Sequence, residues 1–201
     1  MNTQQKKNNK KADGKNQRND EIAAKPKSAY QERLYIVNLL EMNVVLYPNE
    51  IGQTRTRENL KTSIVKKIEG KCTEEGYIRP GSVEVKQYSA GIVKGDMVEF
   101  TVVFQCYSSN PVEGTIIECV IKSITKAGIH AEARDTYGNV PVTVFIARDH
   151  FVEQKAYQEI TETSLETKVF VKVIGTRFEL NDDCVEILGE LIQMENNINK
   201  K

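Results

Sequence analysis

Five segments in the second half of the chain have the composition and spacing of β-strands, and they constrain the fold more than any other feature. Each is rich in apolar and β-branched residues, and polar turns at 126–127, 135–139 and 181–183 separate neighbouring segments. The longest gap, between the third segment and the fourth, contains the acidic stretch 153–166. The second half is therefore predicted to be all-β, with strands at 115–124, 128–133, 140–147, 168–178 and 185–192.

The number of strands and the position of the long gap together predict a barrel. A five-stranded barrel with a long connection after its third strand is typical of the OB-fold, whose outer face binds single-stranded nucleic acid. Such binding needs flat side chains for stacking and nearby cations for phosphate. We therefore look for a functional site among the aromatic and basic residues of these strands.

The first half combines strands with a single helix, so the whole chain is predicted to be of the α+β class. Strands are expected at 34–40, 44–47, 83–85 and 92–93. The clearest alternation lies in 97–107, where every second residue is apolar. This pattern predicts a strand with one buried face, formed by Val98, Phe100, Val102, Phe104 and Cys106.

Residues 54–68 have the periodicity of an amphipathic helix. Leu60, Ile64 and Ile68 recur at helical spacing, and basic residues occupy many of the remaining positions. Gly70 is placed where a glycine commonly ends a helix. A helix of about four turns is therefore predicted before the next strand.

A polar loop at 69–78 follows this helix and is bracketed by Gly70 and Gly76. Because it joins a helix to a strand, we expect it to project from the fold. Its local chemistry fits an ordinary helix cap and turn, with no partner required. The alternative interpretation is a docking tip that another protein receives.

Charge is unevenly distributed in a chain whose formal net charge is zero. Residues 1–29 contain eight Lys and Arg against three Asp and Glu, a balance of 8 − 3 = +5, which leaves the remainder at −5. This segment is expected to be a disordered basic arm, either a solubilising extension or a contact for nucleic acid or an acidic partner. The expected layout continues with an N-terminal domain at 30–110, a barrel domain at 111–195 and a tail at 196–201.

The sequence also argues against several classes of protein. No apolar run approaches the length needed to cross a bilayer, and the N-terminus lacks the apolar stretch of a secretory signal, so we expect an intracellular protein without membrane contact. The four cysteines form no C-x-x-C pair, which indicates neither a metal site nor a disulfide framework. They are Cys72, Cys106, Cys119 and Cys184, and we expect them to be reduced.

Catalysis is not expected either. Only His130 and His150 could act as imidazole bases, and the chain contains no H-E-x-x-H, phosphate-loop or G-x-S-x-G motif. The acidic pairs at 74–75 and 182–183 lie in expected turns, where solvated carboxylates are common. No catalytic residue, metal or cofactor is therefore predicted.

Several stretches resemble known families. Residues 113–120 and 126–132 resemble the opening of an OB-fold of the ribosomal protein S-one type. The loop 69–78 and the segments 144–150 and 172–177 resemble the seventh-subunit family of eukaryotic RNA polymerase II, which has a counterpart in the archaeal polymerase. The second resemblance covers roughly residues 34–192 in the correct order and so includes both halves.

This resemblance implies a non-catalytic stalk subunit of a multisubunit DNA-directed RNA polymerase, acting in transcription initiation and elongation. The implied N-terminal domain is a truncated ribonucleoprotein-like fold, an antiparallel sheet plus one helix, whose tip loop wedges into the large subunits of the polymerase core. The OB-fold would face single-stranded nascent RNA, and a second small stalk subunit usually completes the assembly. Glu74 and Glu75 depart from the family pattern, whereas the tip-loop motif matches at Gly70, Lys71, Cys72, Thr73, Gly76, Tyr77 and Ile78.

Two groups of residues are candidates for RNA contact. His130 and Phe145 fall where the module commonly carries aromatic residues, although Phe145 fits a barrel-core position equally well. Ile129 stands where the family commonly has Phe, which predicts a weaker stacking surface. The cations near this pair are Lys122, Lys126 and Arg148, and a second basic and aromatic stripe is expected at Lys168, Phe170 and Lys172, where edge-strand lysines are the alternative.

Two other functions remain open from the sequence. One is a free-standing single-stranded RNA-binding module in translation or RNA decay, and the other is an enzyme such as a nuclease, which we rank far lower. The Asn- and Lys-rich arm and the divergent motifs are consistent with a large DNA virus that encodes its own polymerase, and also with a divergent nuclear or archaeal chain. The expected compartment is the nucleus, or a viral factory and virion.

Overall fold

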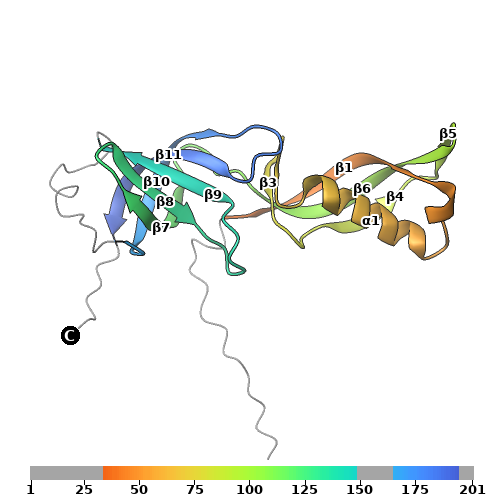
Figure 1. Ribbon diagram of the computed structural model, residues 1–201, viewed down its shortest axis with the longest axis horizontal. Helices are drawn as coiled ribbons and strands as arrows, with labels where there is room; N and C mark the ends of the chain where they lie inside the picture. The colour runs from red at the N-terminus through yellow and green to blue at the C-terminus, as the bar shows by residue number, and fades with distance from the viewer. Residues whose placement is uncertain (1–33, 149–164, 195–201) are drawn as a thin grey trace, which may run out of the picture.

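The computed structural model describes residues 34–148 and 165–194 of the 201-residue chain. The described residues form two parts along the long axis of the molecule, a sheet with one helix and a barrel (Figure 1). The predictions for the basic arm, the C-terminal tail and most of the acidic stretch lie outside the described residues. Each part is built from segments that are contiguous in sequence.

The N-terminal part is an antiparallel sheet centred on its longest strand, β6 (Met97–Ser109). The strand β1 (Ile36–Leu46) pairs with it along its whole length, from the Ile36 and Ser108 pair to the Leu46 and Val98 pair. The shorter strands also pair with β6, except that β2 pairs only with β3. They are β2 (Cys72–Thr73), β3 (Gly76–Ile78), β4 (Glu84–Tyr88) and β5 (Ile92–Lys94).

One helix, α1 (Arg55–Ile68), packs on this sheet, after a single 3-10 turn, η1 (Pro48–Glu50). Leu60 and Ile64 are fully buried, in one core with Val102 and Phe104 of β6. Burial of such a side chain contributes roughly 1.5–3 kcal/mol. The predicted helix and the predicted alternation of β6 are confirmed, because both apolar faces meet in this core.

The prediction of two separate strands at 34–40 and 44–47 is wrong, because β1 is continuous. Glu41 and Asn43 interrupt the apolar run, but both are exposed, while Val44 is buried. The polar residues therefore belong to the outward face of an alternating strand. An antiparallel sheet with one helix is present as predicted, and its description as ribonucleoprotein-like stays a prediction.

The second part is a closed barrel of five strands in the order β10-β11-β9-β8-β7, with β10 also paired to β7. Its one parallel pair joins β9 and β11, and the other pairs are antiparallel. The predicted barrel is confirmed, and it is consistent with an OB-fold. The observed strands are β7 (Ile116–Ile124), β8 (Gly128–Ala133), β9 (Val142–Ala147), β10 (Lys168–Arg177) and β11 (Val185–Met194).

The two parts share a hydrophobic core at their junction. Leu34, Cys72 and Tyr77 of the N-terminal part are buried in the same cluster as the barrel residues. The Cys72 amide donates to the Asp182 carbonyl oxygen at 2.7 Å, and the Asn181 amide donates to the Cys72 carbonyl oxygen at 2.9 Å. Hydrogen bonds and apolar contacts therefore both join the two parts.

Candidate functional site

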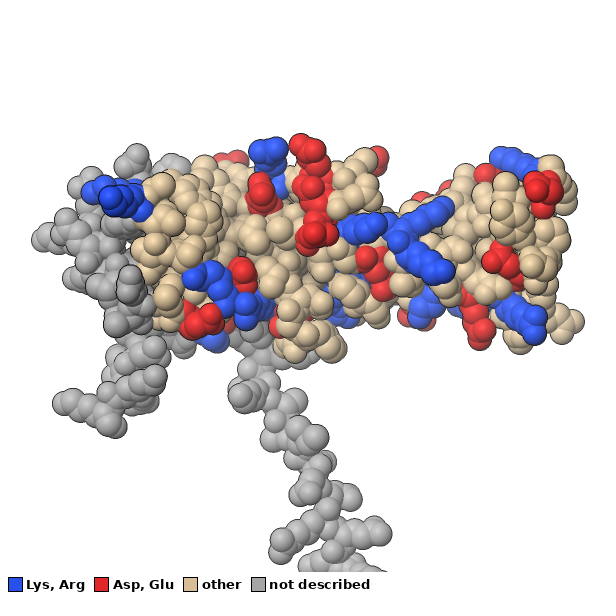
Figure 2. All heavy atoms as spheres, in the orientation of Figure 1, with Lys and Arg blue, Asp and Glu red and all other residues tan. Residues whose placement is uncertain are grey.

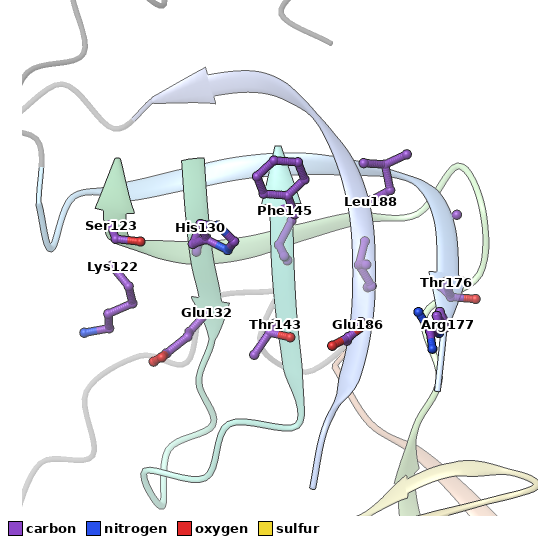
Figure 3. A pocket seen from close by; sticks show the side chains of 14 residues that line it. Lys122, Ser123, His130, Glu132, Thr143, Phe145, Thr176, Arg177, Glu186 and Leu188 are labelled. Carbon is purple, nitrogen blue, oxygen red and sulfur yellow. The ribbon is translucent and has the colours of Figure 1, made fainter. Parts of the chain in front are cut away.

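The outer face of the barrel has a hollow of about 840 Å³ that extends across all five strands (Figure 3). Most of the residues that line it point outward, and the buried core residues Ala131, Val144 and Ile187 lie between them, because alternate residues of each strand fill the barrel core. The lining comprises Lys122, Ser123, His130, Ala131, Glu132, Thr143, Val144, Phe145, Gly175, Thr176, Arg177, Glu186, Ile187 and Leu188.

An aromatic row crosses the hollow. His130 of β8 lies opposite Phe145 of β9, and their ring centroids are 4.8 Å apart at an interplanar angle of 44°. Leu188 of β11 lies opposite Phe145 on the other side. A Cβ atom at Gly128 would lie 3.0 Å from the ring of Phe145, so the glycine makes room for the ring. We name these two aromatic side chains and the aliphatic side chain beside them the aromatic row, which consists of His130, Phe145 and Leu188.

The alternative interpretation of Phe145 as a barrel-core residue is therefore wrong. Phe145 faces outward, between Val144 and Ile146, which are buried. The expectation that Ile129, in place of Phe, weakens the stacking surface is also wrong, because Ile129 is fully buried in the barrel core. The residue type at position 129 therefore does not affect the outward stacking surface.

A polar row lies next to the aromatic row, two positions away on each of the same three strands (Figure 3). It consists of Glu132, Thr143 and Glu186, which lie opposite one another on β8, β9 and β11. Arg134 donates two hydrogen bonds to Glu132, at 3.1 and 2.9 Å, and so orients that carboxylate. Sequence reasoning missed this row because its members are brought together by strand register alone.

Cations lie at both ends of the polar row. At one end the Lys122 ammonium forms an ion pair with Glu166 and holds the pKa of that carboxyl below its ordinary value. At the other end Arg177 lies opposite Glu186 and 3.5 Å from a carboxylate oxygen of Glu179. On the face shown in Figure 2, basic and acidic side chains of the barrel occur in mixed groups. The hollow is therefore of mixed charge.

The structure brings together some of the predicted RNA-binding residues and separates others. Lys122, His130 and Phe145 line one hollow. Lys126 and Arg148 are exposed at the β7–β8 turn, where the Arg148 amide donates to the Ala127 carbonyl oxygen at 3.1 Å. Both lie outside the lining of the hollow.

The second predicted stripe is present on β10 but lies apart from the hollow. Lys168 forms an ion pair with Glu118 at 2.7 Å. Lys172 lies opposite Glu190, and both line a second, smaller hollow with Glu113. Phe170 is half-buried between these two lysines. Carboxylates next to both lysines make this stripe a weaker phosphate contact than the sequence suggested.

The predicted docking loop does not project as a free loop. Its residues form the β2–β3 hairpin, in which Cys72 is 2% exposed, Tyr77 5% and Ile78 0%. Cys72 and Tyr77 face inward because the hairpin packs against the barrel, and Ile78 is buried in the core between the N-terminal sheet and its helix. The turn at 73–75 is at the surface, with Glu74 and Glu75 exposed. The prediction of a projecting loop is therefore wrong, while its docking role stays a prediction.

A cluster around Arg79, which sequence reasoning missed, joins the two parts of the molecule. The guanidinium carbon of Arg79 lies 4.3 Å from the ring centroid of Tyr107, 5.3 Å from that of Tyr137 and 5.5 Å from that of Tyr35. Cation–π contacts of this kind contribute about 0.5–2 kcal/mol each. No local pattern marks these residues, because they are far apart in sequence.

The end of the molecule opposite the barrel carries exposed apolar residues on β5 (Figure 1). Ile92 is 60% exposed and Val93 74%. Within residues 34–148 and 165–194, no group of His, Cys, Asp and Glu could hold a metal ion, and no helix is long and apolar enough to cross a membrane. His150 lies outside the described residues.

Comparison with known proteins gives two informative relatives, and no family model matches the chain. The chain is 25% identical to DNA-directed RNA polymerase II subunit RPB7 of Glycine max over 157 residues, which cover 72% of this chain and 85% of the relative. It is 26% identical to DNA-directed RNA polymerase II subunit 7 of Arabidopsis thaliana over 154 residues, 70% of this chain and 84% of the relative. This likeness supports the expectation that the chain is not itself an enzyme.

Proposed function

We propose that this chain is a non-catalytic stalk subunit of a DNA-directed RNA polymerase. Its N-terminal part attaches to the large subunits of the core, and its barrel contacts nascent single-stranded RNA in initiation and elongation. The observation that carries the proposal is the likeness to subunit 7 of RNA polymerase II over about 70% of the chain. That likeness is long enough to include both the sheet and the barrel.

The barrel hollow supports the RNA contact. Stacking of a base on an aromatic side chain contributes roughly 1–3 kcal/mol, and His130 and Phe145 provide adjacent rings on the outer face. Lys122 and Arg177 lie at the two ends of the hollow, but each also contacts a carboxylate. RNA affinity is therefore expected to be modest and to fall as the salt concentration rises.

Attachment through the β2–β3 hairpin must use its exposed groups. Lys71 is partly exposed, and Glu74 and Glu75 are exposed at the turn, whereas Tyr77 is buried and unavailable to a partner. Glu74→Lys with Glu75→Lys is therefore the suitable docking variant, because it changes surface charge and leaves the core intact. Ile92→Ser with Val93→Ser removes the exposed apolar side chains at the opposite end of the molecule, and so tests whether that end makes the attachment.

The test is recovery of partners by the tagged full-length chain from its native source, analysed by mass spectrometry. The proposal expects the large polymerase subunits and a second small subunit in the eluate, and loss of both in one of the two surface variants. Recovery of translation or RNA-decay proteins without any polymerase subunit would overturn the proposal. Circular dichroism of each variant checks that the fold is retained.

If the chain were a free-standing RNA-binding module, its barrel should bind RNA without residues 34–108. The shared core argues against this, because removal of Leu34, Cys72 and Tyr77 would expose barrel residues that they cover. Both relatives are plant proteins, so they lend no support to a viral source. We therefore propose the nucleus as the compartment, where an RNA polymerase II acts.

A further inference from the structure

We propose that the barrel hollow selects nucleobases that carry an exocyclic amino group, and that Glu186 is the residue that reads this group. The inference rests on the proposed RNA contact and adds a base preference to it. It follows from the two rows on the barrel face, one able to stack a base and the other able to accept hydrogen bonds from its edge (Figure 3). Cytosine, adenine and guanine are favoured, and uracil is disfavoured.

The spacing of the rows matches this arrangement. Residues two apart on a strand face the same side and lie roughly 6.4–6.8 Å apart along it. Phe145 and Thr143 are two apart on β9, and Leu188 and Glu186 are two apart on β11. A base stacked on the aromatic row therefore extends one edge toward the polar row.

The chemistry of the polar row determines which edge is favourable. A carboxylate is an acceptor only, so it binds the amino group of cytosine or adenine, and it can pair with two adjacent donors of guanine. Uracil presents one ring N–H between two carbonyl oxygens, and those oxygens are repelled by a carboxylate. The row therefore discriminates by the presence of an amino group.

Of the two carboxylates, Glu186 is the better placed to read a base. Glu132 already accepts two hydrogen bonds from Arg134. Glu186 is exposed, lies opposite Thr143 and Arg177, and forms no ion pair within the part of the chain that the structure describes. Arg177 lies at the end of the row, where its guanidinium contacts Glu179 instead of Glu186.

The experiment measures binding of the full-length chain to labelled oligo(C), oligo(A) and oligo(U) of equal length by fluorescence anisotropy at low and at physiological salt. We expect oligo(C) and oligo(A) to bind about fivefold to tenfold more tightly than oligo(U). In Glu186→Gln the side-chain amide both donates and accepts, so the ratio should fall to about one. Because the carboxylate no longer repels the uracil oxygens, most of this change should appear as tighter binding of oligo(U).

Two matched variants separate base reading from other effects. Glu190→Gln makes the same charge change on the same strand outside the hollow, and it should keep the preference. His130→Ala removes an exposed stacking ring and should weaken all three oligonucleotides. His130 is exposed, so this variant is expected to fold, which a urea titration checks.

The outcomes distinguish this inference from the proposed function. Equal binding of the three oligonucleotides by the unmodified chain overturns the base preference and leaves the RNA contact standing. A preference that survives Glu186→Gln overturns the assignment to Glu186. Failure to bind any oligonucleotide overturns the inference together with the RNA contact, while recovery of polymerase subunits would still support attachment.

Discussion

The Tyr35 hydroxyl donates a hydrogen bond to Asp135 Oδ2 at 3.2 Å, across 100 positions of sequence. Asp135 also accepts hydrogen bonds from the amides of Tyr137 and Asn139, at 2.8 and 2.9 Å, and so organises the turn between β8 and β9. Arg79 lies against the rings of Tyr35 and Tyr137 at the same place. This polar and aromatic cluster fixes the N-terminal part to the barrel.

The first prediction concerns Arg79. Arg79→Met keeps an aliphatic side chain but removes the cation, so it should lower the free energy of unfolding by about 1–2 kcal/mol. Arg177→Met is the control, because the Arg177 ion pair is exposed and is worth little. Urea titration at neutral pH measures both, and an equal effect of the two substitutions would contradict the importance of the cluster.

The second prediction is a loss of stability at alkaline pH. Burial, together with the nearby Asp135 carboxylate, raises the pKa of Tyr35 above its ordinary value of 10.0. Burial, with a smaller contribution from Asp182, raises the pKa of the Cys72 thiol from 9.0 to about 12. Burial, with a smaller contribution from Glu69, raises the pKa of Cys106 to about 11. The unfolded chain therefore releases these protons at lower pH than the folded chain.

The sign of the effect follows from this difference. The stabilisation is fully present below pH 9 and is lost as the pH rises through the raised pKa values, by up to about 1.4 kcal/mol per pH unit for each group. Tyr35→Phe should cost about 1 kcal/mol at neutral pH through the lost hydrogen bond and make the decline above pH 10 shallower. Urea titrations of the unmodified chain and of Tyr35→Phe from pH 7.5 to 11 measure the free energy of unfolding and its decline with pH. If the free energy of unfolding declined equally in the two proteins, the pKa of Tyr35 would not be raised.

The third prediction concerns Gly76 in the hairpin. Gly76 has a φ of +93°, and a Cβ atom there would lie 2.4 Å from the Ser109 carbonyl oxygen. Gly76→Ala should therefore lower the free energy of unfolding by more than about 2 kcal/mol, through backbone strain and a clash. Gly95, with a φ of +66° and no atom within 4 Å, is the control, and Gly95→Ala should cost only about 1 kcal/mol. If the two substitutions lowered the free energy of unfolding equally, the close contact between Gly76 and Ser109 of β6 would be unimportant.

The fourth prediction is a gain of RNA affinity. A Cβ atom at Gly175 would meet no atom within 4 Å, and this residue lines the hollow. Gly175→Lys should therefore fold normally and add one phosphate contact, which makes the logarithmic salt dependence of single-strand binding steeper by about 0.7 and raises affinity about fivefold at 0.1 M salt.

A matched control for this gain is Val112→Lys, which adds the same charge at an exposed position outside the hollow. It should change affinity much less. Binding of labelled oligo(C) to both variants over a range of salt concentrations is the measurement. Equal gains would show that total charge, and not a contact in the hollow, governs binding.

Local periodicity was sufficient to predict most of the strands and the helix. Alternation in β6 and the helical spacing in α1 arise from packing against one neighbour, so each is visible in a short window of sequence. Local reasoning was wrong at β1, where Glu41 and Asn43 interrupt the apolar run but not the strand. It was also wrong about the loop at 69–78, because the barrel residues that cover it come more than a hundred positions later.

The amino-acid sequence alone predicts a sheet with one helix followed by a barrel, and it identifies His130 and Phe145 as a pair of interest. The outward direction of these rings, the second row of Glu132, Thr143 and Glu186 beside them, and the burial of Cys72 and Tyr77 at the junction depend on the folded arrangement. They depend on it because strand register and barrel closure bring together residues that no local pattern relates.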